Sequence, residues 1–545
     1  MTLFGSRFAG LKLAAIGMAA IAAMPDATAD QVKLSRDEYR RAANALSPFK
    51  RILDAYLLQW FLPDNVVRTL PRGSSAADLM LEFIKSKEAE RFFNSKRGRE
   101  TDAAIDRLAG RDRTLAELIL SAAEQRRFFH WELEFPEAFY TPRPDAEQHV
   151  EMMPNPGFDA VVGNPPYDVL SELENDVDLS GLEDFFDSAP TYQPALMGKN
   201  NLYKLFVCRS QTLAKDAGLI GMIVPMGILG NDQMVGLRRL FLQTGRLRSV
   251  DAFPQKDDPE RRVFREAKLA TCVFVYERLA SSGSNDQPFV ARQHPADQID
   301  PTSPSVQLLG EDLEKYDPVN IAIVTASQTD WDLAVRIVNS HAIQKLGSVC
   351  RWYQGEINET VARQKGFLAD SSANEVVRGA AVCLYAIRAA SQGEDLFLNK
   401  QRYLRDANPG SKAFHHLHPR VVMQNAAPQN NFRRLIGAPL SAGHFCSYKL
   451  NYTIPPACSV QLAFVMALVN SKLADWFFRL GSASADVNHY QLDNLPCPRF
   501  CDLDPDDDRR ASAFIEKALK PVGKLAIYQR HDERQLDRTS GWNGV

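Results

Sequence analysis

Apolar residues between positions 30 and 130 recur at the three- and four-residue steps that are typical of amphipathic helices. One run with this spacing consists of Tyr39, Leu46, Phe49, Ile52, Leu53, Tyr56 and Trp60. A further helix is predicted after Ser74 or Ser75, because either hydroxyl can accept a hydrogen bond at its N-terminus. Another is predicted from Thr101 to Phe129, with a break near Gly110. The pattern therefore indicates a helical N-terminal region.

The pattern changes near residue 128, where short apolar runs begin to alternate with helical stretches. The expected elements are buried strands over 159–162, 218–229, 249–253 and 269–276, and helices over 201–215 and 232–247. Arginines of the last helix, such as Arg238, are expected on a solvated face. Alternating strands and helices are typical of an α/β domain with a mainly parallel sheet.

A polar, proline-rich stretch at 280–306 indicates a domain boundary. The unit after it is expected to mix strands over 420–423 and 434–437 with a helix over 460–480. The expected segments are a helical region (1–150), an α/β core (151–280), a connector (281–345), a mixed α+β domain (346–500) and a tail (501–545) with a helix over 511–529.

Composition excludes several classes of protein. Of the 545 residues, 45% are hydrophobic and 24% are charged, as in ordinary globular proteins and unlike collagen, mucin-like stalks or multi-span membrane proteins. Because 64 basic residues face 67 acidic ones, the formal net charge is -3. Global charge therefore gives no support for nucleic-acid binding, although it leaves a local basic cleft open.

The eight cysteines form no CxxC pair and lie mostly in apolar runs, which indicates reduced core residues. Cys497 and Cys501, with His489 nearby, can be drawn as part of a zinc site. No second ligand pair supports that alternative, so no metal is expected.

The N-terminus leaves two interpretations open. Arg7 and Lys12 precede the apolar stretch from Leu13 to Met24, and small residues follow at 27–29, which is the layout of a secretory signal peptide. The stretch is too short for a comfortable membrane span. The alternative is an alanine-rich buried helix, and the residues expected on its buried face are Leu13, Ile16, Ala20 and Ala23.

The most specific chemical feature is Asn164-Pro165-Pro166-Tyr167, which follows the predicted strand Phe158–Gly163 directly. Ligands bind at the carboxyl ends of strands in open α/β sheets. The alternative is an Asn-Pro turn that only ends a strand. FDAVVGNPPY resembles motif IV of the S-adenosylmethionine-dependent N6-adenine DNA methyltransferases, especially type IIG restriction-modification enzymes and their TaqI-like relatives.

This resemblance implies a role for each residue of the motif. The amide oxygen of Asn164 and the carbonyl of Pro165 accept the hydrogens of the adenine amine, which localises its lone pair for attack on a methyl group. Pro166 stiffens the loop, and Tyr167 stacks on a base flipped out of the duplex. Catalysis then consists of positioning and polarisation, with S-adenosyl-L-methionine as cofactor.

The resemblance extends along most of the chain. FHWELEFPEAF resembles a stretch that large members place before motif IV, although an aromatic core strand is the plain interpretation. The segment from Asn201 to Phe206 resembles a helix at the cofactor and base pocket, with Asn201 and Tyr203 as pocket residues. By pattern alone, its other residues pack in the core.

The C-terminal unit resembles a TaqI-like target-recognition domain. Its candidate DNA-reading residues are Arg420, Gln424, Asn425, Gln429, Asn430, Asn431, Arg433 and Arg434, grouped with Phe432. A solvated polar loop is the alternative for any one of them.

The resemblance also implies a glycine-rich turn, motif I, ahead of motif IV. Phe4–Gly10 is the only glycine-spaced candidate within residues 1–157, and no strand can precede it. The cofactor-binding residues therefore stay unassigned, and that half of the domain is expected to be missing or unrecognisable. Residues 1–130 resemble the helical insertion of large members, which favours the helix over the signal peptide. Neither a nuclease cluster nor a Walker A motif is found.

We therefore predict a partial Rossmann-like methyltransferase sheet in an α/β fold, with a helical N-terminal region and a mixed α+β target-recognition domain. The predicted function is cytoplasmic N6-adenine methylation of double-stranded DNA in a restriction-modification or phage-defence system. Expected partners are an upstream-encoded chain with motif I and a restriction or defence subunit, with no membrane. The alternatives are a DNA-binding specificity subunit or inactive remnant, and a secreted interaction protein.

Overall fold

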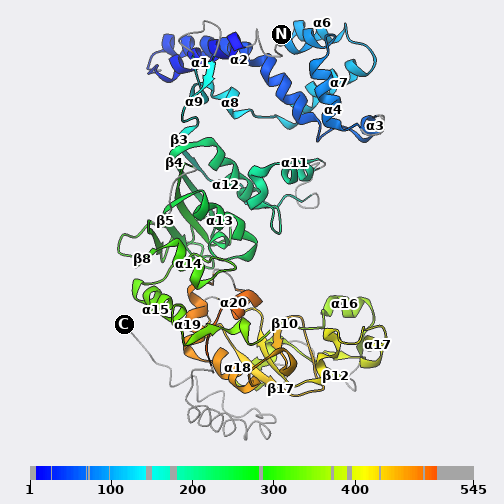
Figure 1. The fold of residues 1–545 in the computed structure, drawn as a ribbon, viewed down its shortest axis with the longest axis vertical. Helices are drawn as coiled ribbons and strands as arrows, with labels where there is room; N and C mark the ends of the chain where they lie inside the picture. The colour runs from blue at the N-terminus through cyan, green and yellow to red at the C-terminus, as the bar shows by residue number, and fades with distance from the viewer. Residues whose placement is uncertain are drawn as a thin grey trace. The chain divides into compact units, whose positions relative to one another are not determined.

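A computed structural model describes residues 8–25, 27–68, 70, 74–96, 98–142, 150–171, 179, 181–280, 287–369, 374–388, 396–428, 431–482 and 485–499. Two compact units divide the chain (Figure 1). One contains Met1–Pro225, Arg239–Val250 and Val273–Asn285, and the other contains Met226–Arg238, Asp251–Cys272 and Asp286–Val545. The predictions for Gln429, Asn430, Cys501 and the tail lie outside the described residues.

Helices form the N-terminal part of the first unit, as the apolar spacing predicts. They are α1 (Phe8–Ala22), α2 (Ala29–Leu58), α3 (Asp64–Val67), α4 (Ala76–Lys85), α5 (Glu90–Asn94), α6 (Arg99–Ile105) and α7 (Gly110–Arg126). Ser75 caps α4, since its hydroxyl accepts a hydrogen bond from the Asp78 amide at 3.1 Å and the Asp78 carboxylate accepts one from the Ser75 amide at 2.9 Å. The cap and the break before Gly110 are both confirmed.

The alanine-rich segment forms α1, which packs on α2 through small residues. Its buried residues include Leu11, Ala14 and Ala15. A Cβ atom on Gly10 would lie 2.7 Å from the carbonyl oxygen of Ala45, so the two backbones approach closely there. The expected buried face is wrong, because its four residues are exposed: Leu13, Ile16, Ala20 and Ala23. Because the backbones of α1 and α2 lie so close, the contact between them is made by small side chains and not by the largest apolar ones.

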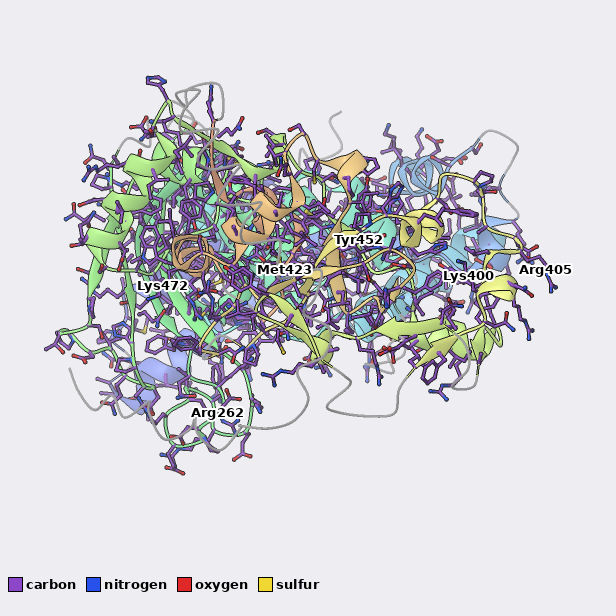
Figure 2. All side chains as sticks on the ribbon, turned by 90° about the horizontal axis from the view of Figure 1, so that it is seen from below. Arg262, Lys400, Arg405, Met423, Tyr452 and Lys472 are labelled. Atoms are coloured by element: carbon purple, nitrogen blue, oxygen red, sulfur yellow. The ribbon has the colours of Figure 1, made fainter. Side chains whose placement is uncertain are left out.

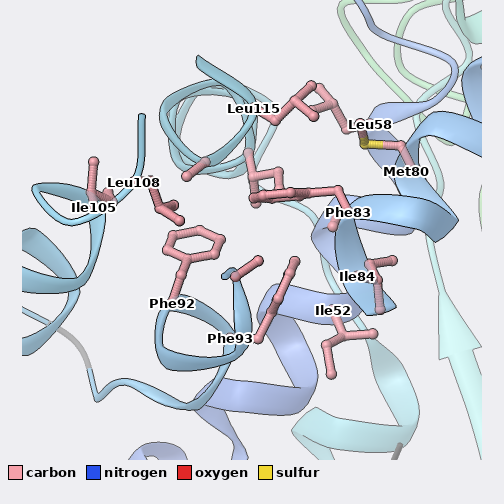
Figure 3. Close-up of a cluster of buried hydrophobic side chains, with 14 of the residues drawn as sticks. Ile52, Leu58, Met80, Phe83, Ile84, Phe92, Phe93, Ile105, Leu108 and Leu115 are labelled. Carbon is pink, nitrogen blue, oxygen red and sulfur yellow. The ribbon is translucent and has the colours of Figure 1, made fainter. Parts of the chain in front are cut away.

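A hydrophobic core joins α2, α4, α5, α6 and α7 (Figure 3). Phe83, Phe92 and Phe93 contact one another there, with ring centroids 6.2, 5.4 and 5.1 Å apart. Arg51 of α2 is buried beside them. One of its terminal nitrogens donates to the backbone carbonyl of Phe92, and the other donates to the Thr101 hydroxyl at 3.0 Å. These bonds tie α2 to α5 and α6.

The aromatic stretch after α7 forms two short helices, α8 (Trp131–Glu134) and α9 (Pro136–Phe139). A hairpin of two strands, β1 (Tyr140–Pro142) and β2 (Val150–Met152), follows it. The expected core strand is therefore wrong here. Pro136 occupies the first turn of α9, a position where its missing amide hydrogen costs nothing.

A six-stranded sheet with the order β3-β4-β6-β5-β7-β8 follows. Its strands are β3 (Phe158–Gly163), β4 (Ala214–Pro225), β5 (Gly245–Phe253), β6 (Thr271–Arg278), β7 (Phe289–Gln293) and β8 (Ser305–Leu308). The helices between β3 and β5 are α11 (Leu182–Ser188), α12 (Leu202–Leu213) and α13 (Val235–Gln243). Strands β3 and β4 are parallel, whereas β7 and β8 are antiparallel. The α/β alternation is confirmed.

Strand β3 is less buried than its apolar composition predicts. It ends the strand order, with β4 as its one neighbour among the described strands. Val162 is 84% exposed, so the face of β3 on which its side chain lies is uncovered. The prediction of a buried strand is wrong because it assumed cover on both faces. A parallel strand with an open apolar edge is unusual, since such strands are normally covered.

The segment expected to be a connector supplies strands to this sheet. Besides β7 and β8 it contains α14 (Gly310–Tyr316) and α15 (Gln328–Val338). Val306 and Leu308 alternate with exposed neighbours along β8 and are buried. The connector prediction is therefore wrong for 289–338, because the proline-rich composition hid a strand with only two buried side chains.

The C-terminal part of the second unit mixes short strands and helices, as predicted. Its strands are β9 (Ile343–Lys345), β10 (Tyr353–Gln354), β11 (Leu368–Ala369), β12 (Asn374–Val377), β13 (Val382–Cys383), β14 (Ala386–Ile387), β15 (Phe397–Leu398), β16 (Arg420–Gln424), β17 (Gly437–Leu440), β18 (Phe445–Cys446), β19 (Leu450–Thr453) and β20 (Pro496–Pro498). Two four-stranded sheets have the orders β10-β19-β16-β17 and β11-β15-β12-β18. Figure 2 labels Met423 and Tyr452, which lie on the adjacent strands β16 and β19 of the first sheet.

The helices of this part are α16 (Glu359–Gln364), α17 (Lys400–Leu404), α18 (Leu462–Val469), α19 (Lys472–Leu480) and α20 (His489–Asp493). The helix predicted over 460–480 is broken at Asn470. The side chain of Asn470 exchanges two 2.8 Å hydrogen bonds with the backbone of Gly437. The strand expected over 434–437 instead begins at Gly437 and continues to Leu440.

Candidate functional site

The parallel ladder between β3 and β4 places Asn164 at the carboxyl end of both strands. Gly163 is the last residue of β3 and pairs with Met222 of β4. Asn164 is exposed, Pro165 is buried and Pro166 is exposed. Because each proline fixes its own φ, the buried Pro165 anchors the loop while Asn164 stays accessible.

The ring of Tyr167 is fixed from two sides. Its hydroxyl donates a hydrogen bond to the backbone carbonyl of Ile223 in β4 at 3.2 Å. Its ring meets Tyr203 of α12 edge-on, with centroids 6.2 Å apart and planes at 86°. Tyr203 is 2% exposed, so it supports Tyr167 from the core. The structure thus brings together Tyr167 and Tyr203, two of the residues expected in the pocket, and Tyr203 is buried behind Tyr167.

The segment after the motif pairs with the start of α12. Val169 forms an antiparallel bridge with Asn201, and the Leu202 amide donates to the Asp168 carbonyl at 2.9 Å. Asn201 is half-buried and precedes α12 without capping it through its side chain. The structure therefore places Asn201 against the backbone that continues from the motif.

A buried lysine that sequence reasoning treated as ordinary core holds the turn before Asn201. Lys204 is fully buried, and its Nζ donates to the carbonyls of Met197 at 2.7 Å and Lys199 at 3.0 Å. Burial lowers the pKa of Lys204 to about 8. The signal available in the sequence was a cation whose two neighbours in the chain, Tyr203 and Leu205, are both core residues of the helix.

Aromatic rings from the stretch before the hairpin surround the start of β3. Trp131, Phe135 and Phe139 each meet Phe158 edge-on, with centroids 6.0, 5.2 and 5.7 Å away. Such edge-to-face pairs add stabilisation beyond the buried area. This stretch therefore anchors the strand that leads to Asn164, a contact that spacing in the sequence did not reveal.

Two of the candidate DNA-reading residues at the end of β16 use their amide groups inside the second unit. The Gln424 side-chain amide donates to the Val382 carbonyl at 2.9 Å. The Asn425 side-chain amide donates to the Tyr448 carbonyl at 3.0 Å. Both side chains are half-buried.

The loop after β16 contains further candidate DNA-reading residues, which are partly exposed. Asn431 and Arg433 are half-buried, and the Asn431 side-chain amide donates to the Arg433 carbonyl at 3.0 Å. Phe432 between them is 91% exposed.

Two arginines expected to contact DNA lie in the interior instead. Arg434 is 1% exposed, with its guanidinium 5.1 Å from the centre of the Phe478 ring, and burial lowers its pKa to about 10. Arg420 is 2% exposed and forms an ion pair with Glu356 at 3.0 Å. The prediction is therefore wrong for both arginines, because side chains this deeply buried cannot contact a base directly.

Within the part of the chain that the structure describes, no three His, Cys, Asp or Glu side chains gather in a way that could hold a metal ion. His489 instead forms a 3.0 Å hydrogen bond with the Asn451 side chain. Cys497 is buried. Of the helices in the described ranges, none combines the length and apolar character needed to cross a membrane.

Comparison with known proteins shows what the region that contains this site is similar to. Residues 76–258 match the model of the Eco57I restriction-modification methylase family. This part of the chain is therefore similar to restriction-modification methylases of the Eco57I type. No curated protein matches the chain.

Solved structures of restriction enzymes resemble the chain at low identity. The type IIG restriction endonuclease BpuSI is 12% identical, with 94% of this chain and 72% of that chain covered and a TM-score of 0.28. The type IIL restriction-modification enzyme MmeI in complex with DNA is 9% identical, with 67% and 49% covered and a TM-score of 0.33. The DrdV–DNA complex is 11% identical, with 89% and 60% covered and a TM-score of 0.33. The chain thus spans less than two thirds of the length of MmeI and DrdV.

Proposed function

We propose that this chain is a site-specific DNA methyltransferase that methylates the N6 amine of adenine in a restriction-modification or phage-defence system. The observation that carries the proposal is the exposed Asn164 at the carboxyl end of β3, next to the fixed ring of Tyr167. The family match over residues 76–258 supports it. In this proposal the enzyme acts on double-stranded DNA in the cytoplasm.

The residues of the motif fit the chemistry of a poorly nucleophilic amine. The adenine amine delocalises its lone pair into the ring, so it must be polarised before it attacks an electrophilic carbon. The Asn164 side-chain oxygen and the Pro165 carbonyl accept its two hydrogens, and the lone pair then localises on nitrogen. Neutral acceptors held in place before the reaction stabilise the positive charge that develops on the amine. The methylated amine returns to neutrality by losing one proton to water.

Tyr167 supplies a surface for the target base. Enzymes that act on atoms inside a duplex turn the base out of the stack and hold it against aromatic side chains. The hydroxyl bond to Ile223 and the contact with Tyr203 fix the ring before the base arrives. This preorganisation reduces the entropy that is lost when the base is bound.

S-adenosyl-L-methionine supplies an electrophilic methyl group on a sulfonium in this proposal. Among the described strands, β3 pairs on one side only, which supports a partner chain that pairs with this strand and carries motif I. A restriction or defence subunit is a further proposed partner.

Transfer of a radioactive methyl group to adenine-containing DNA tests the proposal, with the chain expressed alone and with its upstream-encoded neighbour. Asn164→Ala is expected to lower the rate by about 10²–10³-fold, as the loss of one preorganised polar group does in other enzymes. Asn65→Ala on α3 is a matched control, since Asn65 is exposed and lies on a helix remote in sequence. Transfer that survives Asn164→Ala would remove this residue from the reaction.

The open edge of β3 also favours a second candidate, a DNA-binding specificity subunit or remnant that lacks the cofactor-binding half. Calorimetry with S-adenosylmethionine separates the two. Heat of binding to the chain alone contradicts the second candidate. Duplex binding without cofactor binding or methyl transfer, in the presence of the neighbouring chain as well, contradicts the first.

A further inference from the structure

One loop of the second unit presents a lone aromatic ring to solvent. Phe432 is 91% exposed, more than any other large apolar side chain in the described part of the chain. A single exposed apolar residue is common on protein surfaces and by itself indicates nothing. Phe432 differs from such a residue in how its backbone is held and in the charges near it.

An ion pair on α19 holds the backbone of this loop. Arg479 donates from one terminal nitrogen to the carbonyls of Asn431 at 2.7 Å and Phe432 at 3.1 Å. Its Nε donates to Asp475 at 2.9 Å. The other carboxylate oxygen of Asp475 accepts the backbone amide of Arg434 at 2.7 Å. Asp475 and Arg479 thus hold the backbone on both sides of Phe432.

Arg433 adds a second attachment at the break between α18 and α19. One of its terminal nitrogens donates to the carbonyls of Asn470 and Ser471, each at 2.8 Å. A loop held at two of its carbonyls, one amide and the Arg433 side chain loses little conformational entropy when its tip binds. Phe432 is therefore presented as a stiff projection from a fixed base.

The charges around Phe432 favour an anionic partner. Arg433 follows Phe432 in the chain and is partly exposed. The charges of buried Asp475 and of Arg479 offset each other, whereas Asp486 is an exposed acid near Arg434. A guanidinium that adjoins an exposed aromatic residue in the chain matches a nucleic acid, in which phosphates flank stacked bases.

We propose that Phe432 is a wedge that inserts into a base step of duplex DNA, with Arg433 against an adjoining phosphate. This inference rests on the proposed function and deepens it, because it names the contact through which the second unit deforms its DNA. Apolar side chains inserted between base pairs unstack them and bend the duplex. The stacking contact does not depend on a particular sequence.

Fluorescence anisotropy with a labelled duplex of mixed sequence, about four helical turns long, tests the wedge. Phe432→Ala is expected to weaken binding by about 5- to 150-fold, the range for loss of one stacked base, and to leave the salt dependence unchanged because no phosphate contact is lost. Phe432→Tyr is expected to retain the affinity. Leu417→Ala is the matched control, as Leu417 is 60% exposed in the same unit.

A tryptophan probe gives a second readout. The emission of the Phe432→Trp variant is expected to fall when duplex is added, since stacked bases quench indole, whereas that of the Leu417→Trp variant stays constant. Equal affinity of the wild type and Phe432→Ala, or emission of the Phe432→Trp variant that duplex leaves unchanged, overturns the wedge and leaves the proposed methyltransferase intact. Absence of any duplex binding by the wild type overturns both proposals.

Discussion

The hydroxyl of Tyr167 donates a hydrogen bond to the backbone carbonyl of Ile223, with the two oxygens 3.2 Å apart. Tyr167 belongs to the motif loop and Ile223 to β4, so the bond closes the loop onto the carboxyl end of the sheet. The edge contact with Tyr203 then fixes the remaining rotation of the ring. The hydroxyl and the contact with Tyr203 therefore orient the ring.

This arrangement predicts different effects for two substitutions of Tyr167. Tyr167→Phe removes one hydrogen bond worth about 0.5–1.5 kcal/mol, so methyl transfer should fall by about 2- to 13-fold. Tyr167→Ala also removes the stacking surface, worth about 1–3 kcal/mol, and should cost a further 5- to 150-fold or so. Steady-state methyl transfer at subsaturating DNA measures both. Equal losses in the two variants would show that the hydroxyl acts chemically and the ring does not stack.

Lys204 predicts a pH dependence of stability. Its pKa is lowered by burial from 10.5 to about 8. Between these values the unfolded chain binds a proton that the folded chain has released, so the contribution of Lys204 to the free energy of unfolding rises with pH. The adjacent Cys208, whose pKa burial raises to about 12, stays protonated across this window.

Lys204→Met removes this contribution while keeping most of the volume of the side chain. We therefore expect the wild type to gain stability relative to Lys204→Met from about pH 7.5 to about pH 9.5, measured by urea denaturation at each pH. Lys12→Met on α1 is the control. A wild-type advantage that stays constant over the window would mean that Lys204 does not titrate there.

Periodicity and local motifs predicted the elements that depend on neighbours in sequence. The helices before residue 127 and the capping by Ser75 both follow from local patterns. The position of Asn164 at the end of β3 follows in the same way.

Features that depend on distant contacts could not be predicted from the sequence. Arg238 was expected on a solvated helix face, yet it is fully buried and donates to the carbonyls of Ile228 at 2.7 Å and Asn320 at 2.8 Å. Arg434 is buried in the same manner beside Phe478. A planar guanidinium with five donors can replace water at several carbonyls, and the positions of those carbonyls are set by tertiary structure.

The helical core predicts a large effect of truncating Phe92. Its ring is fully buried, lies 5.1 Å from that of Phe93 and carries the Arg51 guanidinium 5.0 Å from its centre. Phe92→Ala should lower the stability of this region by about 3–5 kcal/mol, because it leaves a cavity in the core and removes the ring that the Arg51 guanidinium contacts. Tyr39→Ala on the exposed face of α2 should change stability by less than about 0.5 kcal/mol. Far-ultraviolet circular dichroism during urea denaturation measures both, and similar midpoints for the two variants would contradict the packing described for this core.

The ion pair between Arg420 and Glu356 predicts that Arg420 stabilises the second unit without contacting DNA. Both side chains are buried, and Arg420 Nη1 donates to the two Glu356 carboxylate oxygens at 3.0 Å each. Arg420→Met leaves a buried carboxylate without its cation and should cost about 3–5 kcal/mol of unfolding free energy. The double variant Glu356→Met with Arg420→Met removes both charges and should recover most of that loss.

Duplex binding at several salt concentrations separates this role from DNA contact. A residue that neutralises a phosphate reduces the slope of log K against log salt by about one unit when it is removed. Because Arg420 is 2% exposed, the double variant should bind duplex with the wild-type slope. A reduced slope together with unchanged stability would place Arg420 on the DNA and contradict its burial. The opposite pattern, lost stability in the single variant and a constant slope in the double variant, assigns the Arg420 side chain to the interior of the second unit.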